Sequence, residues 1–336
     1  MDTILRKREI LASSVIGLAL VVGGCSGVQP RFNSAVDSVK SFFKVDGGSK
    51  QKPVQPSSEA EAMYDAAHQA RAAGRNDEYA SRLEAAANLG HPAAAYEIGI
   101  AYTQGRLVPK DSGTGARYIN RSADLGDQRA QYLVGANFMT GSGVEKNPER
   151  GVAFLARAGE QGHVQAQYLL GVAYADGNGV AKNAPWAARW YGRAARGGHV
   201  GAQYAYGVMY GSGLGLPKDD LESYYWISLA ASGGHEKAGE VAMKIAKRLS
   251  NEQISQVEAD AKKFVPKSYA SLTDPATVIF VQYALRNIGY DAGPIDGMPG
   301  RMTRQGIRAY EEASNLPVNG RISVSLLDGL IESTSR

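Results

Sequence analysis

The sequence repeats itself every 36 residues, and this period restricts the chain to a stack of similar units. A tyrosine recurs in phase at Tyr96, Tyr132, Tyr168 and Tyr204. Two glycine series share the spacing: Gly99, Gly135, Gly171 and Gly207, and Gly90, Gly126, Gly162, Gly198 and Gly234. Each unit leaves an apolar face that only the next unit can cover, so the period predicts a solenoid.

Each unit is predicted to be a pair of helices joined by a glycine-rich loop. The loop reads Gly-Ser-Gly-Val at residues 141–144 and Gly-Asn-Gly-Val at residues 177–180. Such a loop needs positive φ angles, which glycine adopts without penalty. An Asp or Asn after the loop, such as Asp219, is a candidate N-cap for the second helix. The loops help to explain why the chain has 40 glycines, against about 24 at average usage.

This pattern resembles the Sel-one-like repeat, a relative of the tetratricopeptide repeat, over about residues 59–238. The resemblance implies an all-α fold, a right-handed αα-solenoid of about five 36-residue repeats. The first unit, about residues 59–93, has lost the glycine loop and is interpreted as an N-terminal cap. Leu107 stands where later units have a glycine. Proteins with a similar architecture serve in assembly and localisation, so the resemblance favours a role as a scaffold.

Recurring aromatic and histidine side chains have a structural and a binding interpretation. One aromatic series is Tyr102, Phe138, Tyr174 and Tyr210, and another, on the second helices, is Tyr118, Phe154, Trp190 and Trp226. We expect core positions at this fixed helical phase, although exposed rings would form a ladder for sugar or peptide. His91, His163, His199 and His235 follow the terminal glycines. We expect them at turns or N-caps rather than around one metal ion, because a repeat rise separates them.

The N-terminus has the layout of a secretory signal: basic residues 6–8 precede an apolar run at residues 10–22. The run ends in Val-Gly-Gly-Cys at residues 22–25 and resembles the lipobox of bacterial lipoproteins. The resemblance implies that residues 1–24 are removed and that Cys25, the only cysteine, is lipidated. Ser26 in place of Asp favours the periplasmic face of the outer membrane by enterobacterial sorting rules. An uncleaved anchor helix is the alternative.

Residues 25–58 are rich in Pro, Gly and Ser and are predicted to be a flexible tether. Residues 239–272 are predicted to hold capping helices and a linker. Ser250 followed by Gln253 predicts a capping box there. Residues 273–336 are predicted to form a small three-helix domain.

That last segment resembles the small peptidoglycan-binding domain of bacterial wall hydrolases. The matching residues are Gln282, Leu285, Gly289, Tyr290, Asp296, Gly297, Gly300, Thr303, Tyr310, Leu316 and Gly320. We expect Asp296, Thr303 and Tyr310 to face the ligand, because a carboxylate suits sugar hydroxyls or amides and a tyrosine suits a sugar ring. Glu311 stands where the family often has Gln, and its charge argues against tight wall binding.

The residue inventory argues against an enzyme, a metal site or a cofactor. A zinc amidase needs clustered His or carboxylate ligands, but no His follows His235. A thiol transpeptidase needs a free Cys, and the only one is at the lipid position. The net charge of +4 is too small and too dispersed to indicate nucleic-acid binding.

The predicted function is a non-enzymatic outer-membrane adaptor. A lipid anchor holds the membrane, the C-terminal domain holds peptidoglycan, and the repeat surface recruits an unidentified envelope protein. One alternative is an accessory scaffold of an exopolysaccharide secretion machine, in which the repeats bind carbohydrate or a pore protein. Another is a purely structural tether between membrane and wall.

Overall fold

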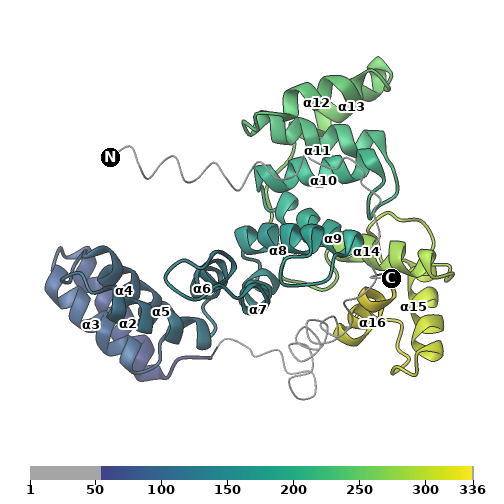
Figure 1. Ribbon diagram of the computed structural model, residues 1–336. Helices are drawn as coiled ribbons and strands as arrows, with labels where there is room; N and C mark the ends of the chain where they lie inside the picture. The colour runs from purple at the N-terminus through teal and green to yellow at the C-terminus, as the bar shows by residue number, and fades with distance from the viewer. Residues whose placement is uncertain (1–53, 335–336) are drawn as a thin grey trace, which may run out of the picture. The chain divides into compact units, whose positions relative to one another are not determined.

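The computed structural model describes residues 54–334, and all of its regular elements are helices (Figure 1). The solenoid helices are α2 (Ser58–Ala72), α3 (Asn76–Asn88), α4 (Pro92–Gln104), α5 (Ser112–Asp124), α6 (Gln128–Thr140), α7 (Pro148–Glu160), α8 (Val164–Asp176), α9 (Ala184–Arg196), α10 (Val200–Ser212) and α11 (Asp220–Ser232). They are followed by α12 (Ala238–Ala246), α13 (Asn251–Ala261), α14 (Pro275–Asn287), α15 (Arg301–Ala313) and α16 (Val324–Thr334). An all-α solenoid followed by a small helical domain is therefore confirmed.

Consecutive solenoid helices pair into hairpins, from α2 with α3 to α10 with α11, and each hairpin packs on the next. The recurring glycines of the first helices permit the close approach within a hairpin. A Cβ atom at Gly171 would lie 2.5 Å from Cδ1 of Tyr191, and one at Gly135 would lie 2.9 Å from Cγ of Leu155. Real Cβ atoms do not approach this closely, so any larger residue would push the hairpin apart.

The histidines at the repeat boundaries lie at N-caps or turns, as expected, and three of the four cap helices. Nδ1 of His91, His163 and His199 accepts a hydrogen bond from the backbone N–H three residues on, at 3.0 to 3.2 Å. Each ring also stacks on a tyrosine of the preceding hairpin, as His199 does on Tyr168 with centroids 4.1 Å apart. His235 stacks on Tyr204 but caps no helix, since α12 begins only at Ala238. One residue thus starts a hairpin and ties it to its neighbour.

In the unit that starts with α6, other residues cap the helix and contact the tyrosine of the preceding hairpin. Asp127 stands at the histidine position and accepts hydrogen bonds from the N–H groups of Arg129 and Ala130. The guanidinium of Arg129 covers the Tyr96 ring at 4.4 Å, where a histidine ring stacks in the other units. A cation–π contact therefore replaces aromatic stacking at this junction.

The aromatic series of the first helices does not form an exposed ladder. Tyr174 and Tyr210 are buried, and Tyr102 and Phe138 are half-buried. Tyr102 stacks on Tyr118 and Phe138 stacks on Phe154, in each case across one hairpin. The packing interpretation is confirmed for the two buried rings, and the series supplies no open aromatic surface for carbohydrate.

The position of Leu107 shows that loop geometry does not depend on glycine alone. Its φ angle is +71°, equal to that of Gly143 and close to those of Gly179 and Gly215. A side chain fits at residue 107, where it is exposed. At Gly179 a Cβ atom would lie 2.4 Å from the carbonyl oxygen of Pro148. Packing therefore requires glycine at Gly179 and at Gly215, whereas a Cβ atom at Gly143 would meet nothing within 4 Å.

Two helices follow the last hairpin and pack against it. α12 and α13 both contact α11. The capping box at the start of α13 is confirmed: the Ser250 side chain accepts from the Gln253 N–H at 3.2 Å, and the Gln253 side chain accepts from the Ser250 N–H at 2.8 Å. These helices cover apolar side chains of α11 such as Ile227 and Ala230.

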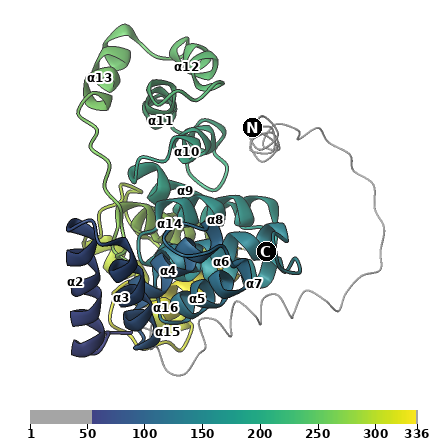
Figure 2. The ribbon, with the colours of Figure 1, turned by 90° about the vertical axis from the view of Figure 1, so that its left-hand side faces the viewer.

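The chain then returns along the solenoid, and α14 of the C-terminal domain packs against α9 (Figure 1, Figure 2). The linker is pinned by backbone contacts: the Lys267 N–H donates to the Arg196 carbonyl at 2.8 Å, and the Tyr269 carbonyl accepts from Gln167 at 2.9 Å. The rings of Trp186 and Phe280 meet edge-on, with centroids 4.7 Å apart. The C-terminal domain is therefore docked on the repeats.

A network of four charged side chains lies in this contact, three of them buried and the fourth, Glu160, half-buried. Arg189 and Arg193, both on α9, donate to the two carboxylate oxygens of Glu160 at 3.0 and 2.9 Å. Nε of Arg193 lies 3.5 Å from Oδ2 of Asp274, and Nε of Arg189 donates to Thr277 at 2.8 Å. The two guanidinium and two carboxylate charges cancel, so burial leaves no net charge. We call these four side chains the α9 quartet.

Asp274 also caps α14, which joins the quartet to the C-terminal domain. Its carboxylate accepts hydrogen bonds from the Thr277 N–H at 3.1 Å and from the Thr277 hydroxyl at 2.6 Å. Both side chains are buried. The helix start of one domain is thus fixed by the arginines of the other.

Replacing Glu160 by Gln should destabilise the chain in a pH-dependent way. Burial by itself raises the pKa of Glu160, but Arg189 and Arg193 lower it to about 2. This stabilisation is fully present above the ordinary value of 4.5 and is lost as the pH falls towards 2. We expect Glu160→Gln to lower the free energy of unfolding by about 3 kcal/mol at pH 7 and by less at pH 3. Urea unfolding at both pH values measures the difference.

The control is Glu149→Gln, an exposed carboxylate at the other end of the same helix α7. It should change the unfolding free energy by under about 1 kcal/mol. Equal effects of the two substitutions at pH 7 would contradict a stabilising role for the quartet.

Candidate functional site

The candidate site is built from two glycine-containing loops of the C-terminal domain. The first loop, residues 288–300, joins α14 to α15, and the second, residues 314–323, joins α15 to α16. Gly297 and Gly320 adopt φ angles of +74° and +69°, which suit glycine. Two buried polar side chains hold these loops in place.

Gln282 on α14 holds the first loop. Its amide oxygen accepts hydrogen bonds from the N–H groups of Asp296 and Gly297 at 3.1 and 3.0 Å. Its amide nitrogen lies 3.0 Å from Oδ1 of Asp296, 3.0 Å from the Met298 carbonyl and 3.2 Å from the Thr303 hydroxyl. Since the side chain is 1% exposed, it positions the loop from within and does not contact a ligand.

Glu311 on α15 holds the second loop in the same way. Its Oε2 atom accepts hydrogen bonds from the N–H groups of Asn319 and Gly320, both at 2.8 Å. The side chain is 1% exposed. The expectation that its charge would weaken wall binding does not fit this geometry, because the carboxylate faces the loop backbone and not the solvent.

Of the three residues expected to face a ligand, only Asp296 is exposed. Its carboxylate accepts from Gln282 and from the Met298 N–H at 2.9 Å, and these hydrogen bonds lower its pKa. Asp296 is therefore a charged acceptor at neutral pH.

Thr303 and Tyr310 are internal, 2% and 7% exposed. The Thr303 hydroxyl donates to the Ala292 carbonyl at 3.0 Å. The Tyr310 ring packs edge-on against Tyr290, and its hydroxyl lies where a Cβ atom at Gly329 would fall. Neither side chain presents a free surface to a ligand, and a part for either in binding stays a prediction.

Exposed side chains that sequence reasoning missed lie on and between the two loops. Met298 and Met302 are 65% and 41% exposed beside Asp296. Arg301, Arg304 and Arg308 are exposed on α15 at spacings of three and four residues, so they share one side of the helix. We call these three residues the α15 arginine stripe. The three-and-four spacing is visible in the sequence and was the available signal.

The stripe connects the two loops. Nη1 of Arg304 donates to the Pro299 carbonyl of the first loop at 2.7 Å. A Cβ atom at Gly320 of the second loop would lie 2.9 Å from Nε of Arg308. Within residues 54–334 no carboxylate lies in ion-pair range of these three arginines. Unpaired guanidinium groups beside an exposed loop suit a ligand that carries carboxylates.

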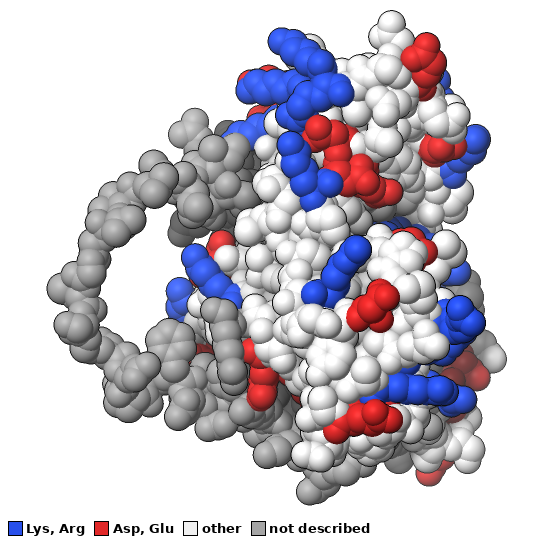
Figure 3. Space-filling view, turned by 90° about the vertical axis from the view of Figure 1, so that its right-hand side faces the viewer, with Lys and Arg blue, Asp and Glu red and all other residues white. Residues whose placement is uncertain are grey.

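Other classes of site find little support in the described part of the chain. There, no cluster of three or more His, Cys, Asp or Glu residues is arranged to hold a metal ion. No helix between residues 54 and 334 has the length and apolarity to cross a bilayer. Figure 3 shows one face on which basic side chains gather in its upper part and elsewhere lie among acidic ones. That face is not uniformly basic.

Comparison with known families identifies both regions. The Sel1 repeat model matches residues 92–127, 128–163, 164–199 and 200–235. The model described as "Putative peptidoglycan binding domain" matches residues 274–328. The chain is a Sel1 repeat protein with a C-terminal domain of this peptidoglycan-binding family. A domain of that family indicates a location in the cell envelope or periplasm.

Two solved structures are similar to this chain. A Sel1 repeat protein from Oxalobacter formigenes is 31% identical over 51% of this chain and 50% of its own, with a TM-score of 0.47. This chain thus matches half the length of that protein. A protective antigen of uropathogenic Escherichia coli, described as displaying an SLR fold, is 16% identical over 84% of this chain and 68% of its own, with a TM-score of 0.52. No curated protein matches the chain.

Replacing Gln282 by Leu should release the first loop. The substitution removes the acceptor of two loop N–H groups, of which that of Gly297 is buried. We expect a loss of about 2 kcal/mol in unfolding free energy and a several-fold loss of binding to isolated sacculi. Urea unfolding and cosedimentation of the whole chain measure the two effects.

The matched control is Glu311→Gln. A Gln oxygen can still accept from both Asn319 and Gly320, so the unfolding free energy should change by under about 1 kcal/mol. If Gln282→Leu leaves the sacculus-bound fraction unchanged, the first loop is not part of the binding surface.

Proposed function

We propose that this protein is a non-enzymatic scaffold lipoprotein of the Gram-negative outer membrane. Its C-terminal domain binds peptidoglycan, and its repeats recruit another envelope protein. The observation that carries the proposal is the direct docking of a peptidoglycan-binding family domain on a Sel1 solenoid through buried side chains of α9. The lipid anchor rests on the sequence around Cys25, which lies outside the described residues.

Docking gives a wall-bound solenoid a fixed orientation. The α9 quartet and the Trp186–Phe280 contact join α9 to α14. A further hydrogen bond of 3.2 Å runs from the Asn183 amide to the Ile331 carbonyl of α16. A domain on a flexible linker would bring a partner near the wall in any orientation. A docked domain presents one face of the repeats in a defined direction, as a scaffold requires.

The carboxylates near the wall-binding loops suit recognition better than catalysis. A general acid needs a pKa raised towards the working pH, whereas hydrogen bonds lower that of Asp296. Glu311 is committed to two backbone N–H groups. We therefore propose no reaction for this site, no cofactor, and a ligand recognised by hydrogen bonds and charge.

The α15 arginine stripe should contribute directly to wall binding. Peptidoglycan carries free carboxylates on its peptide stems, and an arginine binds a carboxylate through two parallel hydrogen bonds. We expect the double substitution Arg304→Gln and Arg308→Gln to reduce the sacculus-bound fraction several-fold at low salt. The wild type should lose this advantage as salt screens the charges. Cosedimentation with purified sacculi at two salt concentrations measures both effects.

Arg106→Gln is the control, an exposed arginine in a repeat loop. It should leave binding unchanged. Wild-type cosedimentation that is absent at every salt concentration would overturn the peptidoglycan proposal. If the wild type and the double variant bind equally, the arginine stripe does not contribute to binding, but the peptidoglycan proposal stands.

The anchor is tested separately at Cys25. We expect Cys25→Ser to abolish incorporation of a labelled fatty acid and to move the protein from the outer-membrane fraction to the soluble periplasmic fraction. A variant that stays in the membrane fraction of lysozyme-treated cells, without label, would contradict lipid anchoring.

The partner is tested by crosslinking in cells, where the repeats should capture one specific envelope protein.

A further inference from the structure

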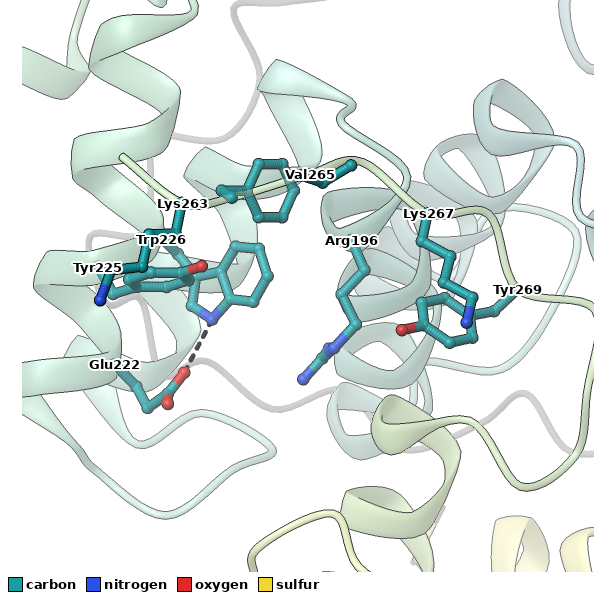
Figure 4. A pocket seen from close by; sticks show the side chains of 9 residues that line it. Arg196, Glu222, Tyr225, Trp226, Lys263, Val265, Lys267 and Tyr269 are labelled. Atoms are coloured by element: carbon teal, nitrogen blue, oxygen red, sulfur yellow. Dashed lines mark hydrogen bonds between the residues drawn. The ribbon is translucent and has the colours of Figure 1, made fainter. Parts of the chain in front are cut away.

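An open pocket of about 470 Å³ lies away from the wall-binding loops. Its walls are Arg196 at the end of α9, side chains of α11 between residues 222 and 226, and linker side chains between residues 263 and 269 (Figure 4). A volume of this size accommodates a small ligand. Neither the resemblance to the repeats nor the wall-binding domain accounts for this pocket, since half of its wall is the returning linker.

The pocket carries more positive than negative charge. Three cations line it, Arg196, Lys263 and Lys267, against one carboxylate, Glu222. Lys263 is paired with Asp260 at 3.0 Å. Glu222 accepts a hydrogen bond from the Trp226 indole at 2.9 Å. For Arg196 and Lys267, no carboxylate of the described residues lies in ion-pair range. After Glu222 is counted, the pocket keeps a net positive charge that an anion would balance.

Arg196 is held in position before any ligand arrives. Its guanidinium carbon lies 5.3 Å from the Trp226 ring centre and 5.6 Å from that of Tyr206. Its Nη1 donates to the Gly192 carbonyl at 3.2 Å. Figure 4 shows the Arg196 side chain between Trp226 and Tyr269. A preorganised guanidinium loses little side-chain entropy when it binds a carboxylate.

The linker wall is fixed as well. The Lys267 N–H donates to the Arg196 carbonyl at 2.8 Å. The Tyr269 carbonyl accepts from Gln167 and from Arg193, both at 2.9 Å. Nζ of Lys267 lies 5.6 Å from the Tyr269 ring centre. Lys267 therefore lies on a linker wall that Arg193 of the α9 quartet helps to hold, and Arg196 lies on α9 itself.

Aromatic rings supply the rest of the pocket surface. Tyr225, Phe264 and Tyr269 are half-buried, so part of each ring remains accessible. Tyr225 and Phe264 both meet the buried Trp226 edge-on. Ring faces bind the apolar face of a pyranose, while polar groups at the rim bind its substituents. Free cations and accessible rings together select a sugar that carries a carboxylate.

We propose that this pocket binds an acidic sugar. Its carboxylate lies between Arg196 and Lys267, and its ring lies against the accessible aromatic side chains. This inference goes beyond the proposed function, because it holds whether or not the C-terminal domain binds the wall. Such a sugar occurs in two sources, a uronic acid of an exported polysaccharide or a wall fragment with a free carboxylate, and the test separates them.

The test is isothermal titration of the detergent-solubilised whole chain with three probes: trigalacturonic acid, its methyl ester, and muropeptides released from sacculi. We expect the acid to bind. Binding of muropeptides counts for this pocket only where Lys267→Ala weakens it, because the wall-binding loops are proposed to bind muropeptides as well. The ester should bind at least about tenfold more weakly than the acid, because it lacks the charge that Arg196 and Lys267 recognise. The tighter of the two acidic probes identifies the source.

The variants are Arg196→Gln and Lys267→Ala, with Lys262→Ala as the matched control. Lys262 is exposed on the same segment but does not line the pocket. Lys267→Ala should weaken binding of the acid about fivefold or more, and Lys262→Ala should not change it. Lys267 is also exposed, so its variant stays informative if Arg196→Gln disturbs folding.

Three results would overturn the proposal: equal affinity for the acid and its ester, equal effects of Lys267→Ala and Lys262→Ala, or no binding of any probe at millimolar concentration. Cosedimentation of the Lys267→Ala chain with sacculi is measured in parallel. Retained cosedimentation with lost titration signal supports two separate sites. A parallel loss of both would assign the effect to the wall-binding loops and contradict the proposal.

Discussion

The α9 quartet is the interaction on which the arrangement of this molecule depends. Removing two guanidinium groups and two carboxylates from water is costly, and apolar side chains of similar volume often stabilise a contact as well. What the charges add is a unique geometry, because each arginine must meet particular oxygens. Glu160 lies on the hairpin before α9, and Asp274 lies at the start of α14. The network therefore aligns three segments at once.

Helix α9 differs from the equivalent helices of the other repeats at the position that contacts α14. In the other full units, the position equivalent to Trp186 holds Thr114, Arg150 or Glu222, all of them polar. In α9 it holds a tryptophan that is 1% exposed and packs on Phe280. One hairpin has thus exchanged a solvated surface for an apolar one, and α14 covers it. A solenoid buries its units against each other, whereas this unit also binds a domain from the end of the chain.

The 36-residue period predicted the contacts that recur in each repeat, but it could not predict contacts that occur only once in the chain. Glycine close packing, the histidine N-caps and the capping box at Ser250 follow from local rules, and the structure contains them. The contact of Arg189 with Thr277 spans 88 residues, and no local rule specifies it. The tryptophan at residue 186 was the available sign, readable only by comparing the units position by position.

The wall-binding loops illustrate a related limit. Matching residues of a family do not reveal which of them face a ligand and which hold the loop. Gln282 and Thr303 belong to the match, yet both are buried and bonded to loop atoms. Asp296 is exposed, as expected. A polar residue in a small domain is as often needed to satisfy buried backbone groups as to bind, because an unpaired buried N–H costs about 1–3 kcal/mol.

The quartet also links the two candidate binding surfaces. Arg193 contacts Asp274 at the start of the wall-binding domain and donates to the Tyr269 carbonyl in the linker that forms the pocket wall. One side chain thus bonds to both segments. Since Arg193 is fully buried, it can adjust little without breaking these contacts. Arg193 is therefore a shared support of the pocket wall and of the start of α14.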